Sequence, residues 1–182
     1  MMKALVLMEH DGTALRPGSG AAIGFARELS EELTVLLLGK NLDAIATEAA
    51  QYAPVLTADH EALAATVADR WAHLIAEVAQ DQNAELIAAT STTWAKDIVG
   101  RAAGLLGGTM ASDVIGHQWT DGQLVMQRPM YAGAVIASVR LTQQPYIVTI
   151  RPSAYEAAEP AATSHPCESL SIDDLALPDH IQ

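Results

Sequence analysis

The sequence predicts an α/β fold, with a mostly parallel sheet flanked by helices and with antiparallel strands added to it. Short apolar runs alternate four times with helical patterns, which is typical of a parallel sheet with crossover helices on its faces. Beyond Gly108, strand-like runs follow one another without helices between them. Half of the 182 residues are apolar but only 4% are aromatic, so Ala, Leu, Ile and Val must fill the core.

Four apolar runs are expected to form the buried strands, because they are apolar on both faces and short. These runs are residues 4–8, 33–38, 55–56 and 86–89. The segments between and after them carry apolar residues at helical spacing. The helices are therefore expected over residues 21–33, 42–52, 61–80 and 95–106. Gly107 and Gly108 end the last of these, as expected of a C-terminal cap.

The region after Gly108 is expected to be antiparallel. Residues 112–119, a turn at Asp121-Gly122 and residues 123–127 have the pattern of a hairpin. Two further strands are expected over 134–141 and 146–150.

The last part of the chain has the composition of a linker or tail. Residues 157–166 are rich in Ala, Pro, Ser and Thr. Residues 167–172 alternate weakly between apolar and polar side chains and could add an edge strand. Residues 173–182 contain too few apolar residues to fold stably. We therefore expect one α/β domain over residues 1–155 and an acidic tail over residues 156–182.

The net charge of −12 bears on the class of partner. An acidic surface repels nucleic-acid backbones and anionic membranes, so neither is an expected partner. No apolar run approaches the length of a membrane span, about 18 residues, and no segment reads as a signal peptide. The single cysteine, Cys167, allows no disulfide within the chain and fits a reducing cytoplasm, which is the expected location.

A turn of four hydroxyl residues, Thr90, Ser91, Thr92 and Thr93, is the candidate nucleotide site. It lies where the fourth strand ends and a helix starts, the edge at which ligands bind to open parallel sheets. Hydroxyls and free N–H groups at a helix N-terminus suit a phosphate. The structural alternative is a helix cap, with Thr93 as the N-cap. No Walker loop and no G-x-G-x-x-G motif supports a self-sufficient phosphate site.

Glu9, His10 and Asp11, followed by Gly12, could form a metal or acid–base cluster. Adjacent residues on a turn point in different directions, however, and the other histidines lack metal-ligand spacing to this segment. Turn formation at Asp11-Gly12 is the favoured interpretation, and no metal site is expected.

Four side chains are candidates for contacts with a partner: Arg101, Arg128, Tyr131 and Arg151. Arg101 is also four residues after Asp97, the favourable order for a helical ion pair. Arg128 and Arg151 each precede a proline, so both are expected to project from strand ends as internal salt bridges or ligand contacts. Tyr131 could be a hinge, an interface contact or a core plug. No Ser–His–Asp or Cys–His arrangement is visible, so no catalytic residue is expected.

Several segments resemble, in order, the first domain of electron-transfer flavoprotein alpha subunits. The most specific are RPMYAG at 128–133 and TIRP at 149–152. The others are ALVLMEHD at 4–11, VLLLG at 35–39, APVLTAD at 53–59, KDIVGRAA at 96–103 and SDV at 112–114. The match runs over roughly residues 3–155. Three departures are Gly100, where the family usually has proline, the region of Met126, where it usually has an aromatic residue, and Ala134, where it usually has asparagine.

This resemblance implies a three-layer, adenine-nucleotide-hydrolase-like fold and electron transfer as the process. In that family the first alpha domain resembles the beta subunit, which binds AMP. The second alpha domain holds most FAD contacts and opens with a loop rich in glycine and arginine. No such loop occurs in this sequence. The FAD-binding domain is therefore expected to be absent, and FAD is expected in the complete complex and not on this chain alone.

Two functions remain open at this point. In the first, the chain is the N-terminal domain of an alpha subunit and forms a heterodimer with a beta-type subunit. It would be a scaffold for that subunit and a FAD domain in electron transfer from dehydrogenases to the respiratory chain. In the second, it is a free-standing regulatory domain, as a homodimer, that binds AMP or ATP at Thr90–Thr93. Hydrolysis of a nucleotide lacks a visible base.

Overall fold

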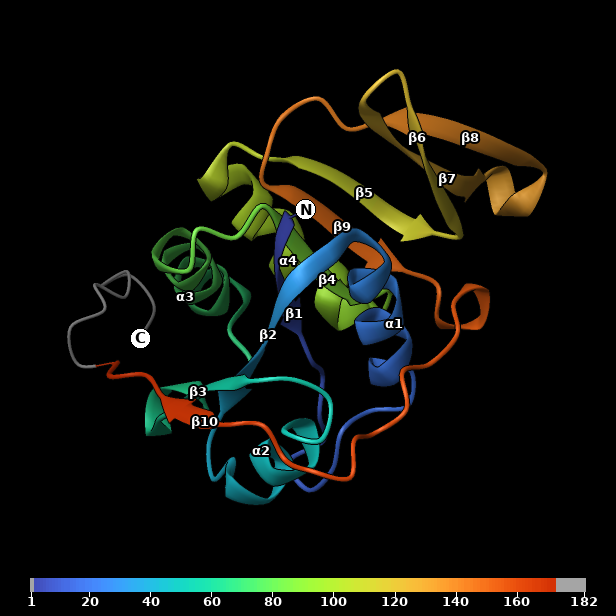
Figure 1. Cartoon of the computed structure of the whole chain (residues 1–182). Helices are drawn as coiled ribbons and strands as arrows, with labels where there is room; N and C mark the ends of the chain where they lie inside the picture. The colour runs from blue at the N-terminus through green and yellow to red at the C-terminus, as the bar shows by residue number, and fades with distance from the viewer. Residues whose placement is uncertain (1, 173–182) are drawn as a thin grey trace.

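The computed structural model describes residues 2–172 and confirms the α/β class. Seven strands form one sheet in the order β10-β3-β2-β1-β4-β9-β5, and every pairing in it is parallel (Figure 1). Its strands are β1 (Met2–Leu7), β2 (Ser30–Gly39), β3 (Val55–Asp59), β4 (Leu86–Thr90), β5 (Thr109–Val114), β9 (Tyr146–Ile150) and β10 (Cys167–Ser169).

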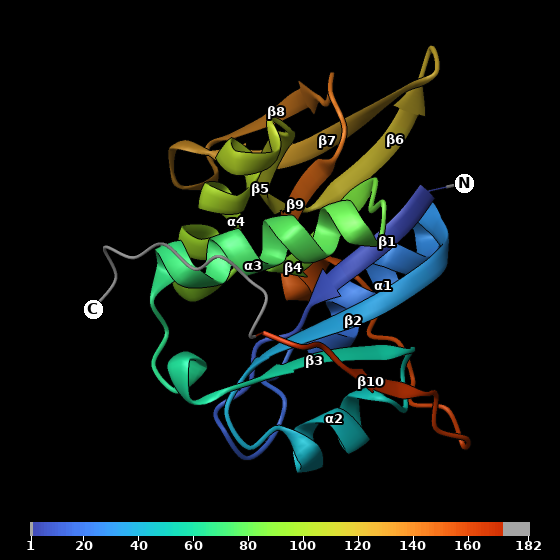
Figure 2. The same cartoon turned by 90° about the vertical axis from the view of Figure 1, so that its left-hand side faces the viewer.

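Helices cover both faces of this sheet, which gives the three-layer arrangement. Alternate side chains of β1 enter separate cores: Ala4 and Val6 pack with α1 and α2, whereas Leu5 and Leu7 pack with α3 and α4. In Figure 2, α3 and α4 lie in front of the strands. The helices are α1 (Ser19–Leu29), α2 (Asp43–Ala49), α3 (Ala68–Asp81) and α4 (Thr93–Leu106). Among residues 2–172, none of the helices has the length and apolar character needed to cross a bilayer.

Two helix predictions need correction. The helix predicted over 21–33 ends at Leu29, because Ser30 already pairs with Met2 in the sheet. The helix predicted over 61–80 is split into a short 3-10 turn, η1 (Glu61–Leu63), and α3. β-branched Thr66 and Val67 separate the two parts, and Val67 is extended with φ −107°. The predicted end of α4 at Gly107 is confirmed, since Gly107 has a φ of 63°.

The prediction of an antiparallel second half is only partly right. β9 lies between β4 and β5 and is parallel to both. The strand predicted over 112–119 is broken at Ile115, so that β5 joins the large sheet. Asp113, with a φ of 58°, lies at an irregularity of the β5–β9 register and redirects the chain there.

The antiparallel part is a small sheet in the order β6-β7-β8. Its strands are β6 (Gly116–Thr120), β7 (Gln123–Met130) and β8 (Val135–Arg140). The turn predicted at Asp121-Gly122 joins β6 to β7, with φ 51° and 74° at its two residues. β7 and β8 are joined by a 3-10 turn, η2 (Tyr131–Gly133).

An aromatic cluster joins the small sheet to α1. The Phe25 ring packs edge-on against His117 of β6, with 5.5 Å between ring centroids, and against Tyr155, at 5.1 Å. Tyr155 follows the last 3-10 turn, η3 (Pro152–Ala154). Burial lowers the pKa of His117, partly offset by Glu28. The base of the small sheet is therefore held by packed rings and not by its strands alone.

The segment of residues 156–166, here called the strap, packs against α1 and leads to β10. Ala158 donates its N–H to the Gly20 carbonyl of α1 at 2.9 Å, and His165 donates to the Ala50 carbonyl at 2.8 Å. β10 then pairs with β3, which confirms the edge strand predicted within 167–172 (Figure 1). The division between residues 1–155 and 156–182 stays a prediction, and the prediction for 173–182 lies outside the described residues.

Candidate functional site

The hydroxyl turn lies at the carboxyl edge of the large sheet, as predicted, between β4 and α4. The helix cap is Thr92 and not Thr93: Thr92 Oγ1 accepts the Ala95 N–H at 3.0 Å. Thr92 is extended, with φ −94° and ψ 165°, whereas Thr93 is already the first helical residue. Sequence spacing alone did not distinguish the two neighbouring threonines.

Three hydroxyls of this turn are bonded to groups of the same chain. Thr90 Oγ1 donates to the Gly18 carbonyl at 3.3 Å, and Thr149 Oγ1 donates to Ser91 Oγ at 3.3 Å. Thr92 Oγ1 donates to the Glu9 carboxylate at 2.7 Å. The first turn of α4 thus has a carboxylate beside it, and the helix dipole favours a negative charge at this position.

Glu9, His10 and Asp11 diverge, as the turn interpretation predicts. Glu9 contacts α4, while His10 accepts the Gly12 N–H at Nδ1 and donates from Nε2 to the Leu38 carbonyl at 2.9 Å. The hydroxyl of Thr13, then its backbone N–H and that of Ala14, donate to Asp11 and lower the pKa of this carboxyl to about 2. These bonds close the turn after β1.

A cavity of about 360 Å³ lies beside this turn, between the ends of β1 and β2 and the starts of α3 and α4. Trp71 and Trp94 line it and meet edge-on, with 5.6 Å between ring centroids. Trp71 is only 4% exposed, and its indole N–H has no hydrogen-bond partner within residues 2–172. Lys40, ion-paired with Glu61, lines the same cavity. The sequence did not reveal this cavity, because Trp71 lies in α3 and Trp94 in α4, and only the packing of these two helices brings the rings together.

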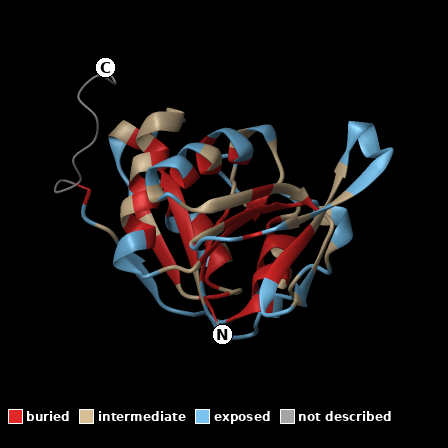
Figure 3. Cartoon of the chain, turned by 90° about the horizontal axis from the view of Figure 1, so that it is seen from above, coloured by how far each residue is buried: buried red, intermediate tan, exposed pale blue. Residues whose placement is uncertain are grey.

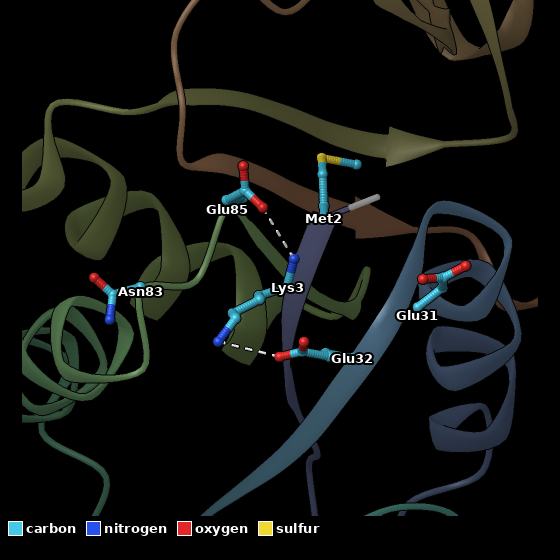
Figure 4. A pocket seen from close by; sticks show the side chains of 6 residues that line it. All are labelled: Met2, Lys3, Glu31, Glu32, Asn83 and Glu85. Atoms are coloured by element: carbon cyan, nitrogen blue, oxygen red, sulfur yellow. Dashed lines mark hydrogen bonds and ion pairs between the residues drawn. The ribbon is translucent and has the colours of Figure 1, made fainter.

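The opposite edge of the sheet has a hollow of about 420 Å³ with acidic walls (Figure 4). Glu31, Glu32 and Glu85 line it, and Lys3 is the cation among its lining residues. Lys3 is already engaged, through Nζ with Glu32 at 3.1 Å and through its backbone N–H with Glu85 at 3.1 Å. This charge disfavours an anionic ligand, so we do not place a nucleotide or flavin phosphate there.

Two of the four predicted contact residues are engaged within the chain. Arg101 bonds Asp97 at 3.2 Å, which confirms the predicted helical pair, and also Asp69 of α3 at 2.6 Å. Arg151 bonds both carboxylate oxygens of Asp113, at 3.1 and 2.6 Å. For Arg151 the internal salt bridge is thus the contact observed.

Contrary to the prediction, Arg128 does not project from a strand end. It lies within β7, opposite Ala137 of β8. β6 stops pairing with β7 at Gln127, so the edge of β7 beyond it is free. Pro129, which has no N–H to donate, is accommodated for that reason. Arg128 forms no ion pair in the part of the chain described, and its Nε is buried without a partner.

The free end of the β7–β8 hairpin, residues 128–137, is here called the arm. Tyr131 at its turn is 79% exposed and has a left-handed backbone, φ 51°, followed by Ala132 at 54°. Met130 pairs with Val135, and Pro129 with Ile136, so neighbouring pairs face opposite sides of the hairpin. Met130, Val135 and Ile136 are 39%, 49% and 51% exposed. The arm therefore presents apolar side chains on both faces, and Figure 3 shows it as an exposed projection.

Comparisons with known proteins give one consistent result. The family model described as electron transfer flavoprotein domain matches residues 4–175. The chain is 30% identical over 173 residues to the electron transfer flavoprotein subunit alpha of Pseudomonas aeruginosa, covering 93% of this chain and 54% of the relative. The corresponding subunit of Paracoccus denitrificans is 33% identical, with 97% and 56% covered. The mitochondrial one of Arabidopsis thaliana is 31% identical, with 90% and 47% covered. The chain thus spans about half the length of these curated relatives.

Proposed function

Because the chain belongs to the electron transfer flavoprotein family and resembles the N-terminal domain of its alpha subunits, we propose that it is a docking scaffold. On it a beta-type subunit and a FAD-carrying domain assemble into an electron carrier. The carrier passes electrons from dehydrogenases to the respiratory chain, and this chain contributes no catalytic residue of its own. The compartment that we propose is the cytoplasm.

The observation that supports docking is the arm. Monomeric proteins seldom expose contiguous apolar side chains, and those that do usually bury them against a partner. Tyrosine and methionine, two residues enriched at interfaces, stand at the end of the arm as Tyr131 and Met130. Left-handed backbone at two successive non-glycine residues costs free energy, and such strain concentrates at functional positions.

The residues of this chain do not fit FAD by themselves. A flavin dinucleotide needs a cradle of free N–H groups for its pyrophosphate. At the first turn of α4, Thr92 uses its hydroxyl on Ala95 and on the carboxylate of Glu9, a negative charge that would repel the pyrophosphate. FAD, which supplies the redox chemistry when bound, is therefore assigned to the partner domain, and this chain's part is to hold the partners in position.

We expect the isolated chain to be colourless and to carry flavin only in the assembled complex. Mixed with a beta-type subunit, a separate flavin domain and FAD, it should elute with both proteins as one species that absorbs near 450 nm, at roughly micromolar concentrations. Size-exclusion chromatography with absorbance detection checks this outcome. A chain that elutes alone under the same conditions would overturn the scaffold function.

We also propose a second function, adenine-nucleotide binding, because the cavity beside Trp94 favours it. A purine could stack on the Trp94 indole, with Lys40, which lines the same cavity, near its phosphate. In this proposal the nucleotide would lie beside the predicted residues Thr90, Ser91, Thr92 and Thr93 and not on their hydroxyls. The homodimer expected with this function stays a prediction.

If the cavity binds AMP or ATP, millimolar nucleotide should raise the melting temperature of the isolated chain. Binding to the folded state alone stabilises it by RT ln(1 + [L]/Kd), about 2.7 kcal/mol at a hundredfold excess over Kd. The Trp94→Leu variant should lose the shift, whereas Trp119→Leu, at an exposed tryptophan away from the cavity, should keep it. Equal melting curves with and without nucleotide would exclude this second function.

A further inference from the structure

We propose that Lys96, Arg128 and Arg151 form a cationic site at the base of the arm that binds an acidic segment of the beta-type subunit. This inference rests on the docking function proposed above and names the chemistry of the partner. The segment is expected to carry an Asp or Glu beside an apolar side chain.

Arg151 contacts one carboxylate, Asp113, and the charges of Lys96 and Arg128 also act on it. Arg151 binds it directly, and the same carboxyl has a lowered pKa, first from the Arg151 hydrogen bonds and further from the charges of Lys96 and Arg128. Neither Lys96 nor Arg128 makes an ion pair or side-chain hydrogen bond within residues 2–172. The cluster therefore keeps an excess of positive charge in a chain whose net charge is −12.

Backbone hydrogen bonds bring these residues together from separate elements. Ile115 donates its N–H to the Gln127 carbonyl at 2.8 Å, which places the end of β5 beside Arg128 in β7. The Asp113 N–H donates to Thr149 Oγ1 at 3.1 Å, and that hydroxyl donates to Ser91 at 3.3 Å, just before α4 and Lys96. Lys96 lies near the start of α4, one helical turn after the cap residue Thr92.

Arg128 links this charge to the apolar arm. Side chains alternate along a strand, so Arg128 shares one face of β7 with Met126 and Met130. Met126 is fully buried in the core, whereas Met130 is 39% exposed. This face of β7 therefore changes from buried to exposed at Arg128, which lies between the two methionines. A partner segment that packs on Met130 and on its paired residue Val135 would therefore also lie next to the Arg128 guanidinium.

A carboxylate is the group that best satisfies the hydrogen-bond donors of Arg128. Its guanidinium makes no ion pair within residues 2–172, and a charged group that becomes buried at an interface without an acceptor is costly. The guanidinium fork matches the two oxygens of a carboxylate. A second copy of this chain is a poorer occupant, since two chains of net charge −12 repel each other. The apolar side chains adjoining the cations favour a protein segment over a free anion.

The test compares charge-neutralising variants for binding to the beta-type subunit. Arg128→Gln and Lys96→Gln should each weaken binding, Arg128→Gln by about tenfold or more, because a charge-assisted hydrogen bond is lost. The effect should shrink at high ionic strength, which screens partly exposed charges. The matched control is Arg140→Gln, the same charge change at the exposed far end of β8, expected to alter binding less than about twofold.

The outcomes separate this inference from the docking function. If Arg128→Gln and Lys96→Gln bind like Arg140→Gln while an arm variant, Val135→Glu, loses binding, the cationic site is wrong and docking stands. If the unmodified chain does not bind the subunit, both are wrong. If sedimentation shows that Arg128→Gln weakens self-association instead, the occupant is a second copy and the inference is overturned. Equal melting temperatures show that the variants are folded.

Discussion

Replacing Gly24 with alanine is expected to destabilise the protein by about 1–3 kcal/mol, the usual cost of overpacking. A Cβ at Gly24 would lie 2.1 Å from the carbonyl oxygen of Glu156 in the strap, far inside van der Waals contact. That oxygen belongs to the backbone and cannot rotate away as a flexible side chain would. The neighbouring bond from Ala158 to Gly20 holds the strap at this distance from α1.

The matched control is Gly104→Ala in α4, where an added Cβ meets nothing within 4 Å. Both glycines lie inside helices, so alanine gives each the same gain in helix propensity, about 1 kcal/mol. Gly104→Ala should therefore stabilise the fold while Gly24→Ala destabilises it, as measured by urea denaturation. A Glu-specific protease should also cut faster after Glu156 and Glu159 in Gly24→Ala. Two variants with the same midpoint and cleavage rate would show that the strap is not held against α1.

Substituting the arm residue Val135 with glutamate is expected to abolish association with the beta-type subunit. A carboxylate buried in an apolar contact must be desolvated without a partner, a cost of several kcal/mol that corresponds to a loss of about a hundredfold or more in affinity. Val135 is 49% exposed in the isolated chain, so folding stability should change by less than about 0.5 kcal/mol. Isothermal titration and thermal melting measure the two quantities separately.

The control for the arm is Gln118→Glu, an exposed position of β6 in the same small sheet, paired with Val125 and far from the arm turn. It introduces the same charge, so it reports any general electrostatic repulsion between the acidic chain and its partner. Affinity retained by Val135→Glu, or lost equally by Gln118→Glu, would show that the arm is not the docking element.

Local signals in the sequence were read correctly where a few neighbouring residues decide the conformation. The Gly107 cap, the Asp121-Gly122 turn and the Asp97–Arg101 pair all appear as predicted. In each case the chemistry is contained within one turn of backbone, so distant packing has little effect on it.

Predictions that depended on strand partners were less successful. The segment 146–150 is a strand, as predicted, but nothing in its five residues indicates that it is parallel or that it inserts between β4 and β5. The same holds for the break at Ile115 and for the position of Arg128, which depends on β6 ending its pairing at Gln127. Strand direction and neighbour are set by long-range packing.

The sequence by itself determined the α/β class, the order of most elements and, through collinear motifs, the electron transfer flavoprotein family. It could do so because hydrophobic periodicity and turn chemistry are properties of adjacent residues. Only the tertiary structure decided that the hydroxyls near Thr92 are already bonded, that Trp71 and Trp94 line one cavity, and that an apolar arm stands beside three cations. These juxtapositions join residues up to 83 positions apart, as Glu9 and Thr92 are, and they form only when the sheet brings its strand ends to one edge.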